Sequence, residues 1–373
     1  MSGFTPPPYP YDRLAPLKAA AEASPGGLVD LSIGTPCDDP PANVIAALAD
    51  PEAARTYPPS IGTPAYREAA SEWLGRRLGV EVEPASLAAC VGTKEMVAGL
   101  PHWLRLRNPG LDTVLYPAVS YPTYAMGATL AGCRAVPVAV DDRWRISLDS
   151  ISESDAKRAL CLWVNTPGNP AGGLDDLAAA ARWGQERGVT VISDECYVEF
   201  TWSGPPRSIL QSPGPGLLAV HSLSKRSNLA GARVGFYAGD PDLVGYLSEV
   251  RKHAGFMPSG PEQAAGALAW SDDAHVEEQR GRYRTRLDLL ADALRSAGLS
   301  VTDPEGAFYL WLAAPGGDAW GLAERLAVEC GALVSPGEFY GDQAAGHVRI
   351  AAVQPTERIR ALADRLADAK LIP

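Results

Sequence analysis

Short apolar runs alternate with longer amphipathic segments through the middle of the chain. Several of the runs are apolar nearly throughout, which is typical of strands covered on both faces of a sheet. These runs predict strands at Asp112–Tyr116, Arg134–Val138, Ala159–Val164, Thr190–Ser193, Leu217–Val220 and Ala232–Ala238. Helical patterns lie between them at Lys94–Arg107, Tyr121–Ala131, Leu174–Arg187 and Asp240–His253. The alternation predicts an α/β fold, with a mainly parallel sheet flanked by helices.

The pattern of apolar and polar positions changes after about Pro261. The pattern there predicts a long charged helix, a strand, a helix, a further strand and a terminal helix, at Asp272–Ala297, Ala307–Leu312, Trp320–Cys330, Val348–Ala352 and Thr356–Ala369. This order is typical of a smaller α+β domain. We therefore expect an N-terminal segment (1–40) that packs on the small domain, a large domain (41–265) and a small C-terminal domain (266–373).

Composition and charge narrow the class of protein. The 373 residues are 46% hydrophobic and 21% charged, which supplies a core and excludes intrinsic disorder. The net charge of −11 argues against a nucleic-acid partner. No apolar run is long enough to span a bilayer, and the Pro-rich start lacks the features of a secretory signal. The six cysteines are scattered without zinc spacing. We expect a cytoplasmic protein with reduced thiols, no membrane partner and no metal site.

One lysine stands in an unusual context, because the chain has only six lysines. Lys225 ends the sequence His-Ser-Leu-Ser-Lys directly after an apolar run, so it lies at the carboxyl end of a strand, where α/β proteins bind ligands. Ser222, Ser224 and Arg233 suit a phosphate, and Lys225 suits a Schiff base. The alternative is a surface lysine beside helix-capping serines. The spacing from Lys225 to Arg233, with its flanking glycines, favours the phosphate site.

Two further strand ends carry polar residues. Asp194 ends an apolar strand, and Tyr197 follows three residues later. A carboxylate there can pair with a protonated ring nitrogen, although it could equally cap the next helix. Asn169 lies in the loop Asn-Thr-Pro-Gly-Asn-Pro and can bond a ligand oxygen; a plain turn is the commoner explanation. Together with Lys225, these residues make the set that a pyridoxal phosphate site requires.

At this point the chain resembles the fold-type I, class I/II aminotransferases, which depend on pyridoxal 5′-phosphate. The resemblance runs in the expected order from about Asp30 to Arg349. It implies a large domain with a mainly parallel seven-stranded sheet flanked by helices, plus a smaller α+β domain. In the loop Asn165-Thr-Pro-Gly-Asn169-Pro-Ala171-Gly172 the chain departs from the usual pattern, although Asn169 and Pro170 are kept.

The resemblance also implies roles for individual residues. Lys225 is the Schiff-base lysine and the acid/base for the proton shift, and Asp194 keeps the pyridine nitrogen protonated. Tyr197 and Asn169 bond the phenolic oxygen of the ring. The residues that bind phosphate are Ser222, Ser224, Arg233 and the loop Gly92-Thr93-Lys94 at a helix N-terminus.

Four more residues match family positions, although for one of them, Tyr121, an aromatic packed in the core is the commoner explanation. Tyr121 matches the aromatic residue that stacks on the cofactor, and Tyr57 matches the tyrosine that binds the phosphate of a neighbouring subunit. The second match implies a homodimer. Gly34 and Arg349 match the substrate-binding positions that clamp the α-carboxylate, with Asn169 beside them, while the alternative for Arg349 is an exposed strand edge.

Several phrases, such as Arg251-Lys-His-Ala-Gly255 and Gly337-Glu-Phe-Tyr-Gly341, are similar to bacterial N-succinyldiaminopimelate aminotransferases. The resemblance implies transfer of an amino group between N-succinyl-LL-2,6-diaminopimelate and 2-oxoglutarate, forming glutamate, in lysine biosynthesis. The cluster Arg251-Lys252-His253 is one candidate for binding the distal carboxylates; a basic helix end is at least as good an explanation.

Other functions remain open from the sequence. An aminotransferase for another amino acid or for a secondary-metabolism substrate would keep the same cofactor residues. A lyase on this fold could share them too, because fold and cofactor do not fix the reaction. A transcription regulator would need an added basic domain, which the charge of −11 disfavours.

Overall fold

The computed structural model describes residues 4–369 and 371–372. The chain divides into two compact units. The large unit comprises Thr35–Gly281 and Pro304–Ala307, and the small unit comprises the described residues up to Gly34 together with Arg282–Asp303 and those from Phe308 onward. Within the described part of the chain, no helix is long and apolar enough to cross a membrane.

A seven-stranded sheet forms the centre of the large unit, as the family resemblance implied. Its strands, in chain order, are β2 (Leu87–Cys90), β3 (Thr113–Pro117), β4 (Arg134–Val138), β5 (Ala159–Asn165), β6 (Thr190–Asp194), β7 (Leu217–Ser222) and β8 (Gly235–Gly239). Their spatial order is β2-β8-β7-β6-β5-β3-β4. Neighbouring strands are parallel except for β8, which runs antiparallel to both β7 and β2. Every residue of β5 and β7 is buried, so the prediction from their apolar runs is confirmed.

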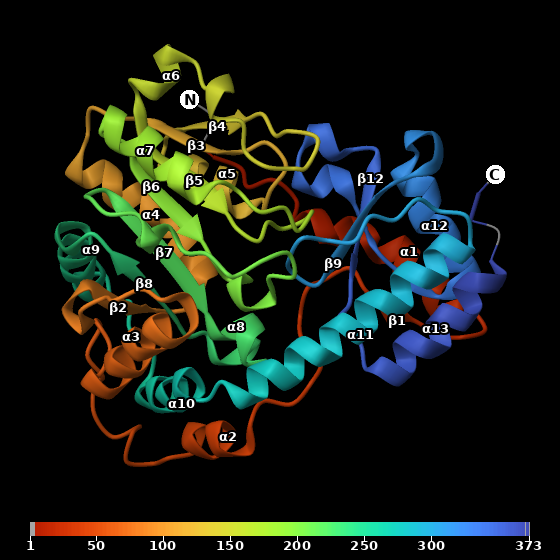
Figure 1. The fold of residues 1–373 in the computed structure, drawn as a ribbon, viewed down its shortest axis with the longest axis horizontal. Coiled ribbons are helices and arrows are strands. Elements are labelled where there is room, and N and C mark those ends of the chain that lie inside the picture. The colour runs from red at the N-terminus through yellow and green to blue at the C-terminus, as the bar shows by residue number, and fades with distance from the viewer. Residues whose placement is uncertain (1–3, 370, 373) are drawn as a thin grey trace. The chain divides into compact units, whose positions relative to one another are not determined.

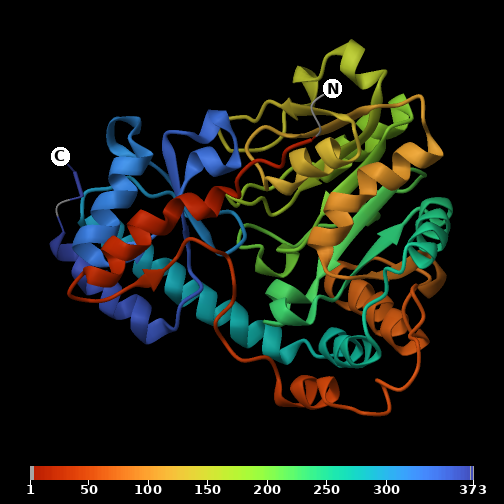
Figure 2. The same cartoon turned by 180° about the vertical axis from the view of Figure 1, so that it is seen from behind.

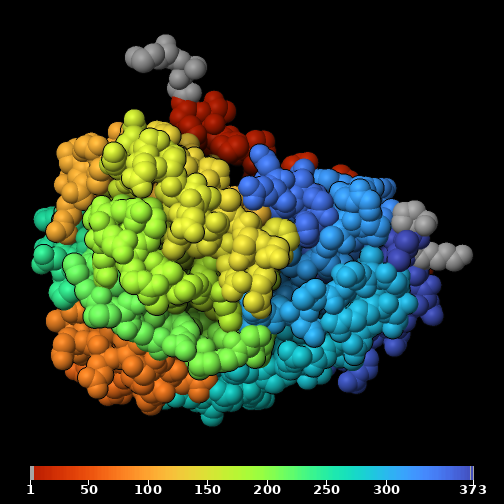
Figure 3. Space-filling model, turned by 45° about the horizontal axis from the view of Figure 1, so that its top comes forward, coloured from red at the N-terminus to blue at the C-terminus, as the bar shows by residue number. Residues whose placement is uncertain are grey.

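Helices cover both faces of this sheet, as Figures 1 and 2 show from opposite sides. The helices of the large unit as far as Ser271 are α2 (Ala42–Leu48), α3 (Pro64–Leu78), α4 (Thr93–Arg107), α5 (Thr123–Leu130), α6 (Glu153–Ala156), α7 (Leu177–Arg187), α8 (Leu223–Arg226), α9 (Pro241–His253) and α10 (Gly260–Ser271), and α2 packs on α10. One apolar cluster joins α4, α5 and α9 to the sheet around Trp163. Other clusters join α7, α3 and α10 to strand residues that alternate with the first set, such as Val191 and Phe236. Figure 3 shows the surface that the chain from β4 to α7 forms, in yellow and light green.

Several element boundaries differ from the sequence prediction. The strand expected from Ala232 begins at Gly235, because Ala230–Ala232 forms a 3-10 turn and Arg233 adopts φ 50°. The long charged helix is α11 (Ala274–Ser296). Asp272 ends the preceding α10 because its backbone is extended, and its carboxylate accepts the Ala274 N–H at the start of α11 at 2.8 Å. The apolar pattern did not reveal β2, because the strand has only four residues and three of them, Ala88, Ala89 and Cys90, are small or sulfur-bearing and give a weak strand signal.

The small unit contains two short sheets. One has the antiparallel order β11-β12-β9, formed by β9 (Tyr309–Ala313), β11 (Ser335–Pro336) and β12 (His347–Ala351). In the other, β1 (Val29–Asp30) pairs in parallel with β10 (Ala332–Leu333). Its helices are α1 (Ala15–Ala23), α12 (Ala319–Cys330), α13 (Thr356–Asp368) and the later part of α11. Helix α10, by contrast, packs on α2 and α3 and so belongs to the large unit.

Two ionisable side chains lie together in the interior beside β6 and β7. The Nε2 atom of His221 is 3.3 Å from a carboxyl oxygen of Glu195, and both side chains are buried. The other Glu195 oxygen accepts the Ile209 N–H at 2.8 Å. Burial raises the pKa of Glu195 to about 7 and lowers the pKa of His221 to about 3. Between these values the folded pair therefore holds one proton.

We predict that Glu195→Gln makes the stability of the chain acid-sensitive. The ordinary pKa values are 4.5 for Glu and 6.5 for His, so the unfolded pair also holds one proton between those pH values, and the pair adds no pH dependence there. In the variant only His221 remains, with its pKa lowered by folding, so its contribution is lost as the pH falls from 6.5. We expect a loss of about 1.4 kcal/mol of unfolding free energy per pH unit, relative to the parent, in denaturant titrations.

His221→Gln is the mirror control. Glu195 alone has a pKa raised by folding, so stability is greatest below pH 4.5 and falls as the pH rises toward 7. If the differences from the parent were flat with pH in both variants, the single proton assigned to the folded pair would be wrong.

Candidate active site

Six segments of the large unit meet at one edge of the sheet. They are the carboxyl ends of β2, β3, β5, β6 and β7 and, because β8 is antiparallel, its amino end. The sequence-predicted residues of this unit at that edge are Gly92, Thr93, Lys94, Tyr121, Asn169, Asp194, Tyr197, Ser222, Ser224, Lys225 and Arg233. Residues far apart in the sequence thus gather where open α/β sheets bind ligands.

Asp194 is the buried acid of this edge. Its carboxylate accepts hydrogen bonds from the Tyr124 phenol at 2.8 Å and from the Cys196 backbone N–H at 3.2 Å. Desolvation raises the pKa of Asp194, while these hydrogen bonds and the positive charge of Lys225 oppose the rise. The carboxylate is therefore suited to hold a further cationic group, such as a protonated ring nitrogen, because that group would complete the neutralisation of its charge.

The loop from Asn165 to Asn169 is hydrogen-bonded to the backbone of Asp194. Asn165 ends β5 and pairs in register with Asp194. Its side-chain amide donates to the Asp194 carbonyl oxygen, and its amide oxygen accepts the Asn169 N–H, both at 2.8 Å. Asn165 thus fixes the start of the loop that carries the buried Asn169. This role was not evident from the sequence motif, in which Asn165 is one polar residue of a turn-rich loop.

An anion site forms around the amino end of α4. Gly92 caps this helix with φ 70°, and a Cβ atom there would clash with Nη2 of Arg233. The guanidinium therefore lies directly against the loop, with its Nη1 donating to the Ala230 carbonyl at 2.7 Å. The Ser222 hydroxyl accepts the Ser224 N–H at 3.1 Å. The N–H groups of a helix start, an arginine and hydroxyl groups together suit a phosphate.

Arg251 supports the Gly92 loop through Glu95. Its guanidinium is buried and donates to both carboxyl oxygens of Glu95, and the Glu95 carboxylate accepts the Val91 N–H at 3.1 Å. The Trp103 ring lies 4.8 Å from it. The candidate role of Arg251 in binding a distal carboxylate is therefore wrong, because its guanidinium is committed to Glu95. Lys252 beside it is exposed and pairs with Glu249 at 3.6 Å.

The three predicted tyrosines differ in exposure. Tyr197 is buried at the start of the 3-10 turn Val198–Phe200. The Tyr121 ring is partly buried and contacts the Tyr124 ring edge-on at 6.0 Å. Tyr57 is 97% exposed, so its side chain does not pack against the site of its own chain.

Arg349 and Gly34 belong to the small unit. Arg349 is 2% exposed, so the alternative of an exposed strand edge is wrong. Its guanidinium lies over the Tyr309 and Tyr340 rings, at 4.3 and 4.8 Å, and donates to the Ser32 carbonyl and, at 3.4 Å, to the Tyr11 hydroxyl. A Cβ atom on Gly34 would clash with the Tyr309 hydroxyl, so a larger residue at this position would require the Tyr309 ring to shift.

The large-unit residues fit pyridoxal phosphate. The cofactor needs a lysine, a carboxylate for its ring nitrogen and an anion site for its phosphate. Lys225 lies close enough to Asp194 to lower its pKa, and Arg233 lies against the Gly92 loop at the same edge. The three groups that the cofactor needs, an amine, a carboxylate and a cation for the phosphate, are therefore present at one edge of the sheet.

Comparison with known proteins identifies the family. The model of aminotransferase class I and II matches residues 27–366. The 4-dedimethylamino-4-oxo-anhydrotetracycline transaminase OxyQ of Streptomyces rimosus is 46% identical over 96% of this chain and 99% of its own. The LL-diaminopimelate aminotransferase of Aquifex aeolicus is 34% identical, with 98% and 97% covered.

A solved structure from Thermus thermophilus, named as a probable N-succinyldiaminopimelate aminotransferase, is similar in fold. It is 30% identical with a TM-score of 0.87, and the match covers 96% of this chain and 99% of that one. The seven-stranded α/β architecture and the cofactor requirement agree across these comparisons. The chain belongs to the class I and II aminotransferases, pyridoxal-phosphate-dependent enzymes of fold type I.

Proposed function

We propose that this aminotransferase transfers an amino group between N-succinyl-LL-2,6-diaminopimelate and 2-oxoglutarate, in the cytoplasmic route to lysine. The solved structure from Thermus thermophilus, 30% identical, and the LL-diaminopimelate aminotransferase, 34% identical, support this substrate class. The observation that carries amino-group transfer itself is the approach of the Lys225 charge to the buried Asp194 beside an anion site.

The proposed mechanism assigns a task to each residue of the large unit. Bound pyridoxal phosphate supplies an electron sink for the substrate carbon. The Lys225 amine takes the proton from the substrate Cα and delivers it to the C4′ carbon of the cofactor. Asp194 keeps the proton on the pyridine nitrogen, and its burial supports this role because a buried carboxylate is stabilised by a cationic partner.

The remaining residues orient the cofactor in this proposal. Tyr197 and Asn169 donate to the phenolic oxygen of the ring, and Tyr121 stacks on the ring face. The phosphate is held by Gly92, Thr93, Lys94, Ser222, Ser224 and Arg233. Their shared position at one edge of the sheet supports this assignment.

The active form in this proposal is a homodimer, in which Tyr57 binds the phosphate of the partner subunit. The support is that Tyr57 is 97% exposed in the single chain. A large aromatic side chain with no packing in its own chain is typical of a residue that is buried at an interface.

A second substrate class has a specific observation in its favour. OxyQ, at 46% identity, is named as a transaminase of an oxo-anhydrotetracycline. The chain could therefore aminate a ketone of secondary metabolism with the same cofactor residues.

The first experiment is a half-reaction with the purified holoenzyme. N-succinyl-LL-2,6-diaminopimelate, LL-diaminopimelate and glutamate are each mixed with it, without an acceptor, while the cofactor absorbance is followed. We expect the succinylated donor and glutamate to convert the cofactor to its amine form, and 2-oxoglutarate to restore it. If glutamate alone converts it, the lysine-pathway substrate is wrong, and an oxo-anhydrotetracycline becomes the acceptor to try.

We predict that Arg349→Lys weakens substrate binding while cofactor retention is unchanged. A lysine cannot offer the paired donors that a carboxylate accepts from arginine. The KM of both the amino donor and 2-oxoglutarate should rise by roughly 10- to 100-fold, because both carry an α-carboxylate. Steady-state kinetics and bound-cofactor absorbance measure the two effects.

The matched control for this variant is Arg295→Lys, an exposed arginine of the small unit that pairs with Asp303. Its KM values should stay at the parent level. Equal loss of substrate and cofactor binding in Arg349→Lys would place Arg349 outside the carboxylate clamp.

We predict that Tyr124→Phe moves the acidic limb of the kcat profile to higher pH by about one unit. The change removes a hydrogen bond that lowers the pKa of Asp194, and such a bond to a charged group contributes about 1.5–3 kcal/mol. Activity should therefore be lost at higher pH as the medium is acidified. Tyr237→Phe is the control, because its buried phenol bonds Ser248 instead, and an identical shift in both variants would refute the role of Tyr124.

A further inference from the structure

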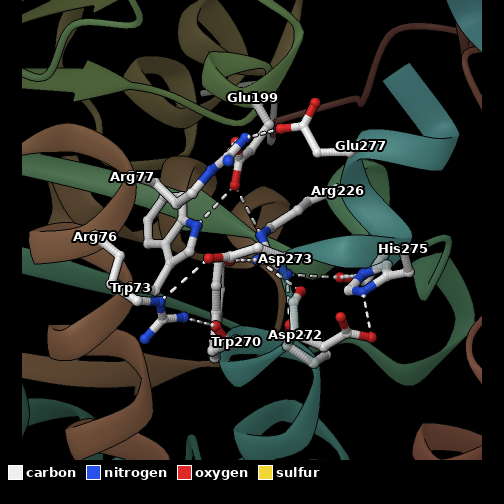
Figure 4. A network of polar contacts seen from close by, with 12 residues as sticks. Trp73, Arg76, Arg77, Glu199, Arg226, Trp270, Asp272, Asp273, His275 and Glu277 are labelled. Atoms are coloured by element: carbon white, nitrogen blue, oxygen red, sulfur yellow. Dashed lines mark hydrogen bonds and ion pairs between the residues drawn. The ribbon is translucent and has the colours of Figure 1, made fainter. Parts of the chain in front are cut away.

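Arg226 follows the proposed Schiff-base lysine and is 2% exposed. All of its nitrogens donate hydrogen bonds, as Figure 4 shows from close by. The acceptors are the Glu199 carboxylate, the Asp273 carboxylate, the Ser227 hydroxyl and the carbonyl oxygens of Ala269 and Asp272. The rings of Trp73 and Trp270 lie 5.6 and 5.1 Å from the guanidinium carbon. The position of the Arg226 guanidinium is therefore fixed by hydrogen bonds and by two aromatic rings.

Glu199 connects Arg226 to the turn after β6, which bears Tyr197. It lies two residues after Tyr197 and is buried. One carboxyl oxygen accepts from Trp73 Nε1 at 2.7 Å and from Arg226 Nε at 3.1 Å, and the other accepts from Arg77 Nε at 3.1 Å. A single carboxylate therefore joins the turn after β6 to the turn after β7.

The residues that follow Arg226 are tied down as well. The Ser227 hydroxyl bonds His275 at 2.9 Å, and the Asn228 amide donates to Gln279 at 3.2 Å. Both partners lie in the first turns of α11. The turn that bears Lys225 is thereby fixed to a long helix as well as to Glu199.

Helix α8 cannot set the direction of Lys225 by itself. It has four residues, and a helix of one turn is unstable without tertiary contacts. Burying an ion pair is also costly: apolar residues of the same volume are often as stabilising or more so. Burial lowers the pKa of Arg226, which reflects that cost. The directed hydrogen bonds of Arg226 and Glu199 fix the relative positions of the two turns, whatever their net contribution to stability.

We propose that Arg226 and Glu199 are positioning residues, which hold Lys225 in a fixed direction relative to Tyr197. The proposal rests on the proposed role of Lys225. It does not depend on which amino donor the enzyme uses, because the geometry concerns the cofactor site alone.

A double-mutant cycle tests the proposal by cofactor binding. The dissociation constant of pyridoxal phosphate is measured by absorbance and fluorescence for the parent, Arg226→Gln, Lys225→Ala and the double variant. We expect Arg226→Gln to weaken binding about 10-fold when Lys225 is present and less than about 2-fold when it is absent. Equal weakening in both backgrounds would overturn the proposal, because Arg226 would then act without Lys225.

Glu199→Gln provides the second test, since it keeps the shape of the side chain and removes its charge. In this variant and in Arg226→Gln, the pH midpoint of the bound-cofactor absorbance should move, while a change that is merely structural would leave it in place. Arg77→Gln is the matched control: Arg77 bonds the same carboxylate but lies on α3, so its midpoint should equal that of the parent. Denaturant unfolding checks that each variant is folded.

The outcomes separate this proposal from the substrate assignment. An unmoved midpoint in folded Glu199→Gln overturns the positioning role even if the half-reaction succeeds. A moved midpoint and a coupled cycle support it even if the succinylated donor fails. If Lys225→Ala binds the cofactor as tightly as the parent, the role of Lys225 and the positioning role fall together.

Discussion

The buried carboxylate of Asp194, at the carboxyl end of β6, requires hydrogen-bond donors and a positive charge from the surrounding structure. Asp194 loses its hydration in the interior, and this desolvation raises its pKa. The chain compensates with a phenol from α5, a backbone N–H and the charge of Lys225. Each of these groups comes from a different segment, so the charge of one residue depends on the sheet bringing these segments to a common edge.

Buried arginines hold several chain segments together at three places. Arg226, Arg251 and Arg349 are all nearly inaccessible to solvent, and each guanidinium lies beside aromatic rings and donates to oxygens of other segments. A planar fork of five donors can tie several chain segments together, which lysine cannot do. The low lysine count of the sequence agrees with this use of arginine in the interior.

The sequence was informative where chemistry and local pattern coincide. The apolar runs of β5, β6 and β7 predicted fully buried strands, and polar residues at their ends predicted the site edge. Tyr124, Asn165, Glu95 and Glu199 escaped prediction, because an ordinary tyrosine, asparagine or glutamate acquires its role only from a partner far away in the sequence. Arg251 shows the same limit: its position at a helix end suggested a distal-carboxylate site or a basic helix end, whereas Glu95, contacted across the fold, holds it in the interior.

The reversed direction of β8 has a consequence for the spacing of the proposed site residues along the chain. Because β8 runs back from the edge at which β7 ends, the connection between them carries Ser224, Lys225 and Arg233 in one short stretch of chain. Three residues proposed to hold the cofactor are therefore neighbours along the chain as well as in space, whereas Gly92, Asn169 and Asp194 reach the same edge only through the pairing of the strands.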